Sequence, residues 1–209
     1  MSDLNVSGRE PAQGAGTVNR RKESPEQDAL SRAHESPLPY EPRWSREWVF
    51  QDFRRNRHRP RTQVLLLAFR LAQAARWPFQ RRPKVWALPI VLMYNFVSEW
   101  VLCVELPIKT LVGPRLTIAH GFGLVVNVDT RIGADVVLRQ HVTIGNRGDS
   151  GGSPTLGDRC DVGAGAILIG PISVGSDSKI GAGSVVLTDI PHGATAVGNP
   201  ARIVGRAGQ

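Results

Sequence analysis

The sequence predicts a mainly β protein built as a parallel β-helix, and a repeat of six residues is the main observation behind this. Between residues 126 and 186 one register carries an aliphatic residue at all but one of its positions, namely Val126, Ile132, Leu138, Ile144, Leu156, Val162, Leu168, Val174, Ile180 and Val186. Glycine often follows directly, and a small or β-branched residue comes four positions after the aliphatic one, as at Val136, Val142, Cys160, Ala166 and Ser184. This pattern is typical of short strands and tight turns that stack into coils around one continuous core.

The alternative is a β-sandwich of short strands. Sandwich strands pair through hairpins and alternate apolar with polar residues at a period of two, which a period of six does not match. The register fails once, at Ser150, within the stretch Gly145–Pro154, which is rich in glycine, aspartate and serine. We therefore expect a loop here that leaves the repeat and returns to it in the same register.

The net charge, the cysteines and the histidines limit which classes of function fit the chain. The formal net charge is +8 at pH 7, and much of the excess lies in Phe53–Arg61 and Arg81–Arg82. Because no aromatic platform or known reading motif accompanies these arginines, we expect no nucleic-acid binding. The two cysteines, Cys103 and Cys160, and the five histidines lack metal-ligand spacing, so we expect no metal. With no secretory signal visible, the sequence favours the cytoplasm.

Three regions follow from composition. Residues 1–60 are rich in Ser, Pro, Glu, Arg and Gly, which predicts a disordered basic leader. Residues 61–104 predict an N-terminal helical segment, which begins with an amphipathic helix over Thr62–Trp77. Residues 105–206 predict the β-helix domain.

The apolar stretch Val85–Val104 has the length of a membrane span, at about 20 residues. Pro89, Asn95, Ser98 and Glu99 disfavour a span, because an unpaired carboxylate in hydrocarbon costs several kcal/mol. Two alternatives stay open: a helix packed on the β-helix or on a sister subunit, and peripheral contact with a membrane, because tryptophan and arginine flank the helices.

His120 is a candidate catalytic base. Glu105 precedes it by fifteen residues, and three hexads make a coil of eighteen, so the two residues should lie near one another on successive coils about 4.8 Å apart. A carboxylate that holds an imidazole fixes its tautomer and raises its basicity, as a general base requires. The alternative is a turn histidine with no catalytic role.

The chain resembles serine acetyltransferase and related hexapeptide-repeat O-acetyltransferases, including those encoded with colanic acid, capsule and other exopolysaccharide genes. The resemblance rests on Ala119-His-Gly-Phe-Gly-Leu-Val-Val126, on Arg139-Gln-His-Val-Thr-Ile-Gly145, and on two C-terminal stretches, Gly181-Ala-Gly-Ser-Val-Val186 and Ala196-Val-Gly-Asn-Pro-Ala-Arg202. It implies a left-handed parallel β-helix of hexapeptide repeats preceded by α-helices.

The resemblance also implies the site. A His and an Asp fifteen residues apart activate the acceptor hydroxyl in this family, which implies His120 as base with Glu105 in place of Asp. Acetyl-CoA binds between the β-helices of a homotrimer, which implies cofactor contacts at Ala164, Lys179, Ala182 and Arg202. Each of the four has an ordinary alternative, as a turn residue or a surface charge.

Departures from serine acetyltransferase bear on the acceptor. That enzyme has Asp directly before the catalytic His and an Arg-His pair before the loop's closing Pro, where this chain has Ala119, Gly152 and Ser153. A zwitterionic amino acid would lose charged partners worth roughly 1.5 to 3 kcal/mol each. We therefore expect an O-acetyltransferase acting on a sugar hydroxyl in surface-polysaccharide synthesis, with His141 and Ser153 at the acceptor and with a cytoplasmic location that extends to the inner face of the plasma membrane. The alternatives are serine O-acetyltransferase and a non-catalytic hexapeptide binding module.

Overall fold

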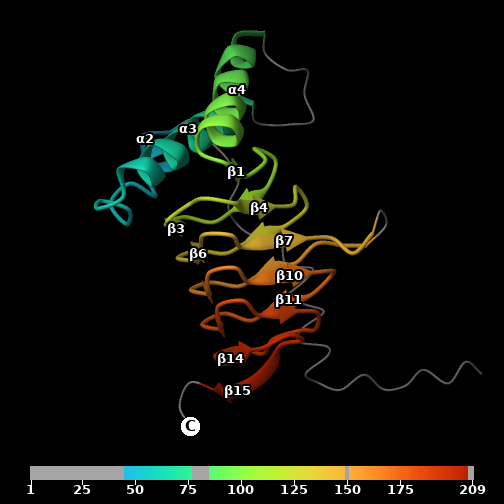
Figure 1. The fold of residues 1–209 in the computed structure, drawn as a ribbon. Helices are drawn as coiled ribbons and strands as arrows, with labels where there is room; N and C mark the ends of the chain where they lie inside the picture. Colours follow the sequence, from blue (N-terminus) through green and yellow to red (C-terminus); the bar gives the residue numbers. More distant parts are fainter. Residues whose placement is uncertain (1–44, 77–84, 149–150, 207–209) are drawn as a thin grey trace, which may run out of the picture.

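A computed structural model describes residues 45–76, 85–148 and 151–206. Short strands form three sheets that make the faces of a β-helix, with helices stacked on its N-terminal end (Figure 1). The chain visits the sheets in a fixed rotation, so that each strand pairs in parallel with the strand one coil away. The predicted mainly β fold of stacked coils is confirmed.

The three sheets, called A, B and C here, differ in length. Sheet A contains β1 (Val104–Glu105), β4 (Leu124–Val126), β7 (Thr143–Gly145), β10 (Ile167–Ile169) and β13 (Val185–Val186). Sheet B contains β2 (Leu111–Val112), β5 (Arg131–Ile132), β8 (Thr155–Leu156) and β11 (Ser173–Val174). Sheet C contains β3 (Thr117–Ala119), β6 (Val137–Arg139), β9 (Asp161–Val162), β12 (Lys179–Ile180), β14 (Ala194–Val197) and β15 (Arg202–Arg206).

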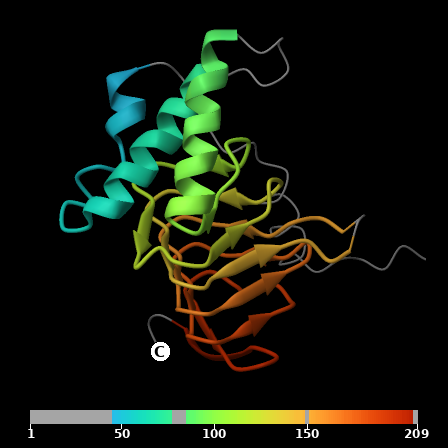
Figure 2. The ribbon, with the colours of Figure 1, turned by 45° about the horizontal axis from the view of Figure 1, so that its top comes forward.

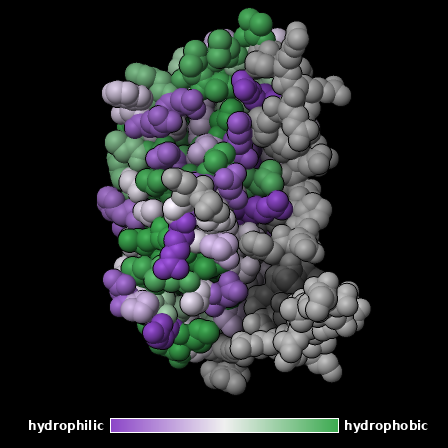
Figure 3. Space-filling view, turned by 90° about the vertical axis from the view of Figure 1, so that its right-hand side faces the viewer, coloured by the Kyte–Doolittle hydropathy of each residue, from purple (hydrophilic) through white to green (hydrophobic). Residues whose placement is uncertain are grey.

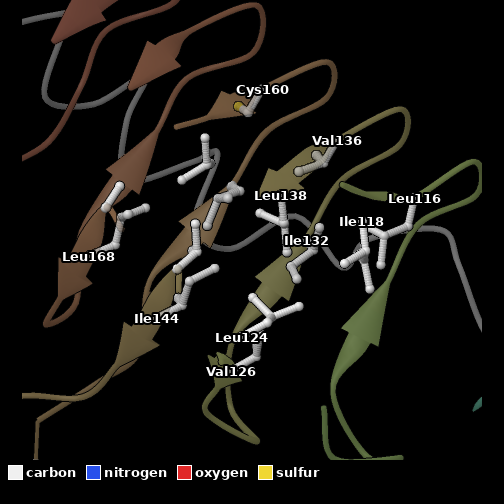
Figure 4. Packing of buried hydrophobic residues seen from close by; sticks show 14 of the residues in the cluster. Leu116, Ile118, Leu124, Val126, Ile132, Val136, Leu138, Ile144, Cys160 and Leu168 are labelled. Carbon is white, nitrogen blue, oxygen red and sulfur yellow. The ribbon is translucent and has the colours of Figure 1, made fainter. Parts of the chain in front are cut away.

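The core is the column of aliphatic side chains that the six-residue register predicts. All ten aliphatic members of the register are buried, and the small residues four positions later, Val136, Val142, Cys160, Ala166 and Ser184, are fully buried beside them. Figure 4 shows labelled members from neighbouring coils, such as Ile132, Leu138, Ile144 and Leu168, pointing into the same narrow interior. Ile144 in β7 and Leu156 in β8 lie on successive strands, so the loop between them is an insertion at one corner of a coil.

The corners between sheets B and C carry an alternating ladder of charges. Arg115, Asp135, Arg159 and Asp177 all adopt the left-handed conformation there, with φ between 57° and 62°. Arg115 Nε donates to Asp135 Oδ1 at 2.7 Å, and Arg159 Nε donates to Asp177 Oδ1 at 2.7 Å. His192 Nδ1 lies 3.7 Å from Asp177 Oδ2 and extends the ladder by one coil. Hydrogen bonds from the arginines lower the pKa of both aspartates.

The N-terminal end of the β-helix is covered by α2 (Arg46–Phe50) and α3 (Pro60–Arg76) (Figure 2). The predicted helix over Thr62–Trp77 therefore exists, although Trp77 lies outside the described residues. The predicted disordered leader of residues 1–60 ends too late, because Trp48, Asp52 and Asn56 are buried, and Asp52 and Asn56 bond the backbone of Leu116 in the first coil. Residues 1–44 lie outside the described part of the chain.

Polar side chains of this helical cap bind the backbone of the first coil. Asn56 Nδ2 donates to Leu116 O at 2.8 Å, and Thr62 Oγ1 donates to Ile118 O at 2.8 Å. Gln73 Nε2 donates to Thr110 O at 3.0 Å. A coil at the end of a stack has no neighbour to pair with on one side, and buried unpaired carbonyls are costly. The cap replaces the missing coil with side-chain donors.

The second helical element is short and ends in an irregular turn. It comprises η1 (Val85–Ala87), α4 (Leu88–Asn95) and the π-helix η2 (Phe96–Val101), which leads into β1. Tyr94 anchors α4, because its buried hydroxyl donates to Leu106 O at 2.5 Å. Burial raises the pKa of this phenol above its ordinary value.

One face of α4 and η2 is apolar and exposed. Trp100 is 79% exposed, and Leu88, Leu92, Met93 and Phe96 are each at least half exposed. In the space-filling view the hydrophobic colour gathers at the top of the molecule, where α4 lies (Figure 3). None of the described helices combines the length and the hydropathy that crossing a bilayer requires.

Candidate active site

The corner between sheets C and A carries four of the eight predicted site residues. His120 follows β3 there on the first coil, and Gln140 and His141 follow β6 on the second. Ala164 follows β9 on the third, and Ala182 follows β12 on the fourth, where Gly183 N donates to Ala164 O at 2.8 Å. Since neighbouring coils are about 4.8 Å apart, this corner joins the candidate base to the candidate cofactor contacts over about 14 Å.

His120 lies at the mouth of a cavity of about 440 Å³. Its φ of 60° is unusual for a residue other than glycine. Phe122 N donates to His120 O at 2.5 Å, which closes a tight turn at the corner. His120, Gly121 and Phe122 all line the cavity, and so do residues 58–62, which lead into α3 and form its first turn. A hydroxyl bound in this cavity would have an imidazole beside it.

Glu105 lies on the outer face of β1, beside a second cavity of about 360 Å³ that is also lined by Glu99 and Cys103. Val104, which precedes Glu105 in β1, lines both this cavity and the one at His120. The two candidate catalytic residues therefore line neighbouring cavities. No hydrogen bond or ion pair joins Glu105 to His120, both of which are described residues. Their catalytic pairing stays a prediction.

His141 lies on the second coil, at the same corner that His120 occupies on the first coil. Its backbone N–H donates to Phe122 O at 2.8 Å. Its ring lies against Gly123, where an added Cβ would come within 2.4 Å of His141 Nδ1. His141, with φ of 56°, therefore uses the space that the missing side chain of Gly123 leaves. This places His141 one coil from His120 at the same corner, and its role at the acceptor stays a prediction.

Ser153 lies at a different corner, between sheets A and B. Its side chain is largely buried, and Ser153 Oγ donates to Asn127 Oδ1 at 2.9 Å. This contact ties the end of the inserted loop to the end of β4. The structure therefore does not bring Ser153 to the corner of His120, and its predicted contact with the acceptor stays a prediction.

The predicted cofactor residues lie on the C-terminal coils. Beside Ala164 and Ala182 the corner is open, because an added Cβ at Gly183 would meet nothing within 4 Å. Lys179 is exposed on β12, where it lies opposite Asp161 of the coil before. Arg202 is exposed at the start of β15 and donates to its neighbour, Ala201 O, at 3.3 Å. The two basic residues therefore lie on strands of sheet C and not at the open corner, and the cofactor contacts stay a prediction.

The cavity wall formed by residues 58–62 was not predicted as part of the site. The arginine run was visible in the sequence, but nothing in it indicated which residues it would face. Arg59 and Arg61 line the cavity, and the Arg61 guanidinium carbon lies 5.0 Å from the centre of the Phe122 ring. Contact between segments about sixty residues apart creates this wall, which a local pattern does not reveal.

Within the described residues no group of three or more His, Cys, Asp or Glu side chains could hold a metal ion. Cys160 is buried in the core, and burial raises the pKa of its thiol to about 12. Its thiol is therefore neutral at physiological pH and acts as a small core side chain.

Comparison with family models found no match to this chain. Individual relatives are nevertheless clear. The chain is 35% identical over 161 residues to the Escherichia coli K12 protein named "Putative colanic acid biosynthesis acetyltransferase WcaB", and the match covers 74% of this chain and 98% of that one. It is 41% identical over 141 residues to a serine acetyltransferase of Helicobacter pylori, with 66% of this chain and 78% of the relative covered.

Solved structures agree with these relatives. Soybean serine acetyltransferase matches with a TM-score of 0.65 and 35% identity, over 76% of this chain and 68% of that chain. Serine acetyltransferase of Brucella abortus, in complex with coenzyme A, matches with a TM-score of 0.65 and 29% identity, over 78% and 68% of the two chains. The chain therefore belongs to the hexapeptide-repeat acetyltransferase family that includes WcaB and the serine acetyltransferases, and it is an acyltransferase.

Proposed function

We propose that this chain transfers an acetyl group from acetyl-CoA to a hydroxyl of a sugar in exopolysaccharide or capsule synthesis. The observation that carries the proposal is the position of His120 at the mouth of a cavity of about 440 Å³, on the corner that leads to the open coils at Ala164 and Ala182. A cavity of this size is in the range of small-molecule sites.

In the proposed reaction the neutral His120 imidazole takes the proton of the acceptor hydroxyl as its oxygen attacks the thioester carbonyl. The tetrahedral intermediate collapses with cleavage of the C–S bond, and the coenzyme A thiolate takes the proton back from the imidazolium. Acetyl-CoA supplies the activated acyl group and the thiolate leaving group. Glu105 orients the imidazole and stabilises its charged form once the acceptor has ordered both side chains, and a backbone N–H of the coil faces the oxyanion.

A sugar is favoured over serine as the acceptor for two reasons. The relative that matches over nearly its whole length, 98%, carries a colanic acid name. The residues next to His120 and before the end of the loop, Ala119, Gly152 and Ser153, also have no charge to pair with an amino acid's ammonium and carboxylate. We include His141 in the acceptor site, because it lies one coil below His120.

Serine remains the second candidate acceptor. The Helicobacter pylori relative is 41% identical, and a soybean serine acetyltransferase in complex with serine is 35% identical with a TM-score of 0.63. The test below therefore includes L-serine as an acceptor.

We further propose that the chain works as a homotrimer and that acetyl-CoA binds between neighbouring subunits at Ala164, Lys179, Ala182 and Arg202. The outer face of sheet A supports this, because Val125 and Ile167 are each more than a third exposed there. Light scattering should give three chains per particle. A monomer with full activity would overturn the trimer.

We also propose peripheral contact with the inner face of the plasma membrane, through the exposed apolar face of α4 and η2. Trp86 and Trp100, near its two ends, fit the interfacial preference of tryptophan. Flotation with anionic vesicles is expected for the wild type and lost in Leu92→Ser/Met93→Ser, with Val64→Ser, an exposed position on α3, as the control. Self-association through this face without vesicle binding would assign the face to a sister subunit.

The test of the reaction is release of free coenzyme A from acetyl-CoA, with sugars, sugar derivatives and L-serine as acceptors. His120→Ala should lower kcat by about 10² to 10⁴, and Glu105→Gln should lower it less and alter the pH–rate profile. His192→Ala, at a different corner, is the matched control with unchanged kcat. Serine-dependent release that His120→Ala abolishes would replace the sugar acceptor by serine, and coenzyme A binding without release would favour a binding module.

A further inference from the structure

The cavity at His120 is lined on one side by unpaired positive charge. His58, Arg59 and Arg61 all contribute to its wall, and none of the residues that line it carries a carboxylate. Within the described part of the chain neither Arg59 nor Arg61 is in an ion pair. Their positive charge is therefore not neutralised by a carboxylate of the described residues.

Two of these groups are already oriented. The Arg61 guanidinium carbon lies 5.0 Å from the centre of the Phe122 ring, two residues from His120 along the chain. His58 Nε2 accepts a hydrogen bond from Arg57 Nε at 2.8 Å. The cavity lining thus includes the Arg61 guanidinium, Arg59 and the His58 ring together with the candidate base.

The rest of the wall limits what can bind. Leu65, Leu102 and Val104 form an apolar portion, and the buried Thr62 hydroxyl is already used by Ile118 O. An arginine pairs best with a phosphate or carboxylate, because its fork of N–H groups matches two oxygens at once. Two arginines and a histidine on one wall match a diphosphate, which offers more acceptor oxygens than a carboxylate, while a neutral sugar would leave these charges without partners.

We propose that the cavity binds a phosphate or diphosphate group of the acceptor, so that the substrate class is a phosphate-linked sugar rather than a free sugar or an amino acid. The inference rests on the proposed function, because it assumes that the acceptor hydroxyl reaches His120. Arg59 and Arg61 hold the phosphate, and the sugar attached to it presents its hydroxyl to the imidazole at the cavity mouth.

The first test needs no catalysis. Inorganic pyrophosphate is titrated calorimetrically into the full-length protein and into Arg59→Gln, Arg61→Gln and Arg54→Gln. Arg54 is exposed in the same arginine run but does not line the cavity, so it is the matched control. We expect one site per chain in the wild type and in Arg54→Gln, with affinity roughly ten- to hundredfold lower in the other two variants. Equal losses in all three variants, or no binding to the wild type, would overturn the proposal.

Competition experiments identify which substrate binds in the cavity. Displacement of pyrophosphate by a nucleotide-diphosphate sugar supports the inference, whereas displacement by coenzyme A alone would assign the cavity to the acyl donor and overturn it. In turnover, Arg61→Gln should raise KM for a phosphate-linked sugar at least tenfold with little change in kcat, and should not change KM for acetyl-CoA.

Two acceptor forms separate the sources of the phosphate: a soluble nucleotide-diphosphate sugar and a polyprenyl-diphosphate sugar in detergent. Turnover of either form supports the inference, and preference for the unphosphorylated sugar would overturn it. Pyrophosphate binding that depends on the arginines, without acetyl transfer to any sugar, would contradict the proposed function but would still support an anion site in the cavity. A failure of the proposed function is therefore distinguishable from a failure of this inference.

Discussion

Arg70 Nε donates to Asp52 Oδ2 at 2.8 Å, and both side chains are buried where the helical cap meets the first coil. The same guanidinium donates to Val112 O at 2.8 Å and to Gly113 O at 2.7 Å, while Asp52 Oδ1 accepts from Leu116 N at 2.9 Å. The pair therefore binds backbone groups that would have no partner at the open end of the β-helix. Burial of a charged pair is tolerable only when its remaining polar atoms are hydrogen-bonded in this way.

Replacement of Arg70 by Met should strongly destabilise the protein. The variant leaves Asp52 buried without its cation and two carbonyls without donors, and such a change costs about 3 to 5 kcal/mol. Chemical denaturation followed by circular dichroism measures the loss, with Arg54→Met as the exposed control. A loss below about 1 kcal/mol would mean that water enters the cap and replaces the guanidinium.

The charge ladder at the corners between sheets B and C should make stability depend on pH. Hydrogen bonds from Arg115 and Arg159 lower the pKa of Asp135 and Asp177. A lowered folded-state pKa gives stability that is present above the unfolded-state pKa of about 3.9 and is lost as the pH falls through the folded-state pKa.

Asp135→Asn/Asp177→Asn should therefore be less stable than the wild type at pH 7, and its stability should fall less steeply in acid. Urea denaturation at pH 7 and pH 3 checks both statements. The ladder is exposed, so added salt should reduce the difference at pH 7. Asp129→Asn is the control, because that side chain makes no ion pair with a described residue. Parallel pH curves for the wild type and the double variant would contradict the prediction.

The two cysteines should differ in reactivity. Cys103 is exposed in the cavity beside Glu105, whereas Cys160 is buried with the pKa of its thiol raised to about 12. Ellman's reagent should therefore modify one thiol in the native protein and two in the denatured protein. Cys103→Ser should abolish the native reaction. Rapid reaction of both thiols in the native state would mean that the coil around Cys160 opens.

Gly123→Ala should disturb the corner at His120 and His141. The added Cβ would lie 2.4 Å from His141 Nδ1, at a φ of +64° that an L-residue adopts only at a cost of roughly 1 to 2 kcal/mol. We expect lower stability and slower acetyl transfer, because the His141 ring must move.

The double variant Gly123→Ala/His141→Ala separates these two causes. Compared with His141→Ala, the double variant should lose only the stability that the strained backbone at residue 123 costs, because the contact with the ring is absent. Thermal denaturation of the four proteins gives the coupling free energy. A coupling of zero would mean that the ring moves away freely.

The part of the fold predicted from sequence is the part that repeats. Each aliphatic residue of the register has the same surroundings one coil away, so Leu138 and Val162 could be assigned to the core from their period alone. The helical cap follows no period. Asp52 and Asn56 look like solvated residues in a polar segment, and only the open end of a coil about sixty residues later gives them partners.

The candidate site follows the repeat only in part. The first coil spans twenty residues rather than eighteen, because Val104 pairs with Leu124. His120 and Glu105 line two neighbouring cavities that share Val104, and their pairing stays a prediction. The directions in which their side chains point depend on the left-handed turn at His120, which the repeat does not specify. The cavity wall with Arg59 and Arg61 depends on how the helical cap packs on the first coil, which a local sequence pattern does not predict.

The way the last coil ends also limits how the protein can assemble. Strand β15 runs antiparallel to β14, unlike the pairings between the other strands of the three sheets. Because antiparallel and parallel ladders place their hydrogen bonds differently, β15 ends the run of parallel pairs in sheet C. With the helical cap on the first coil, the edge of sheet C is therefore covered by a non-repeating element of the same chain at each end, and such covered edges disfavour end-to-end stacking of copies into a filament.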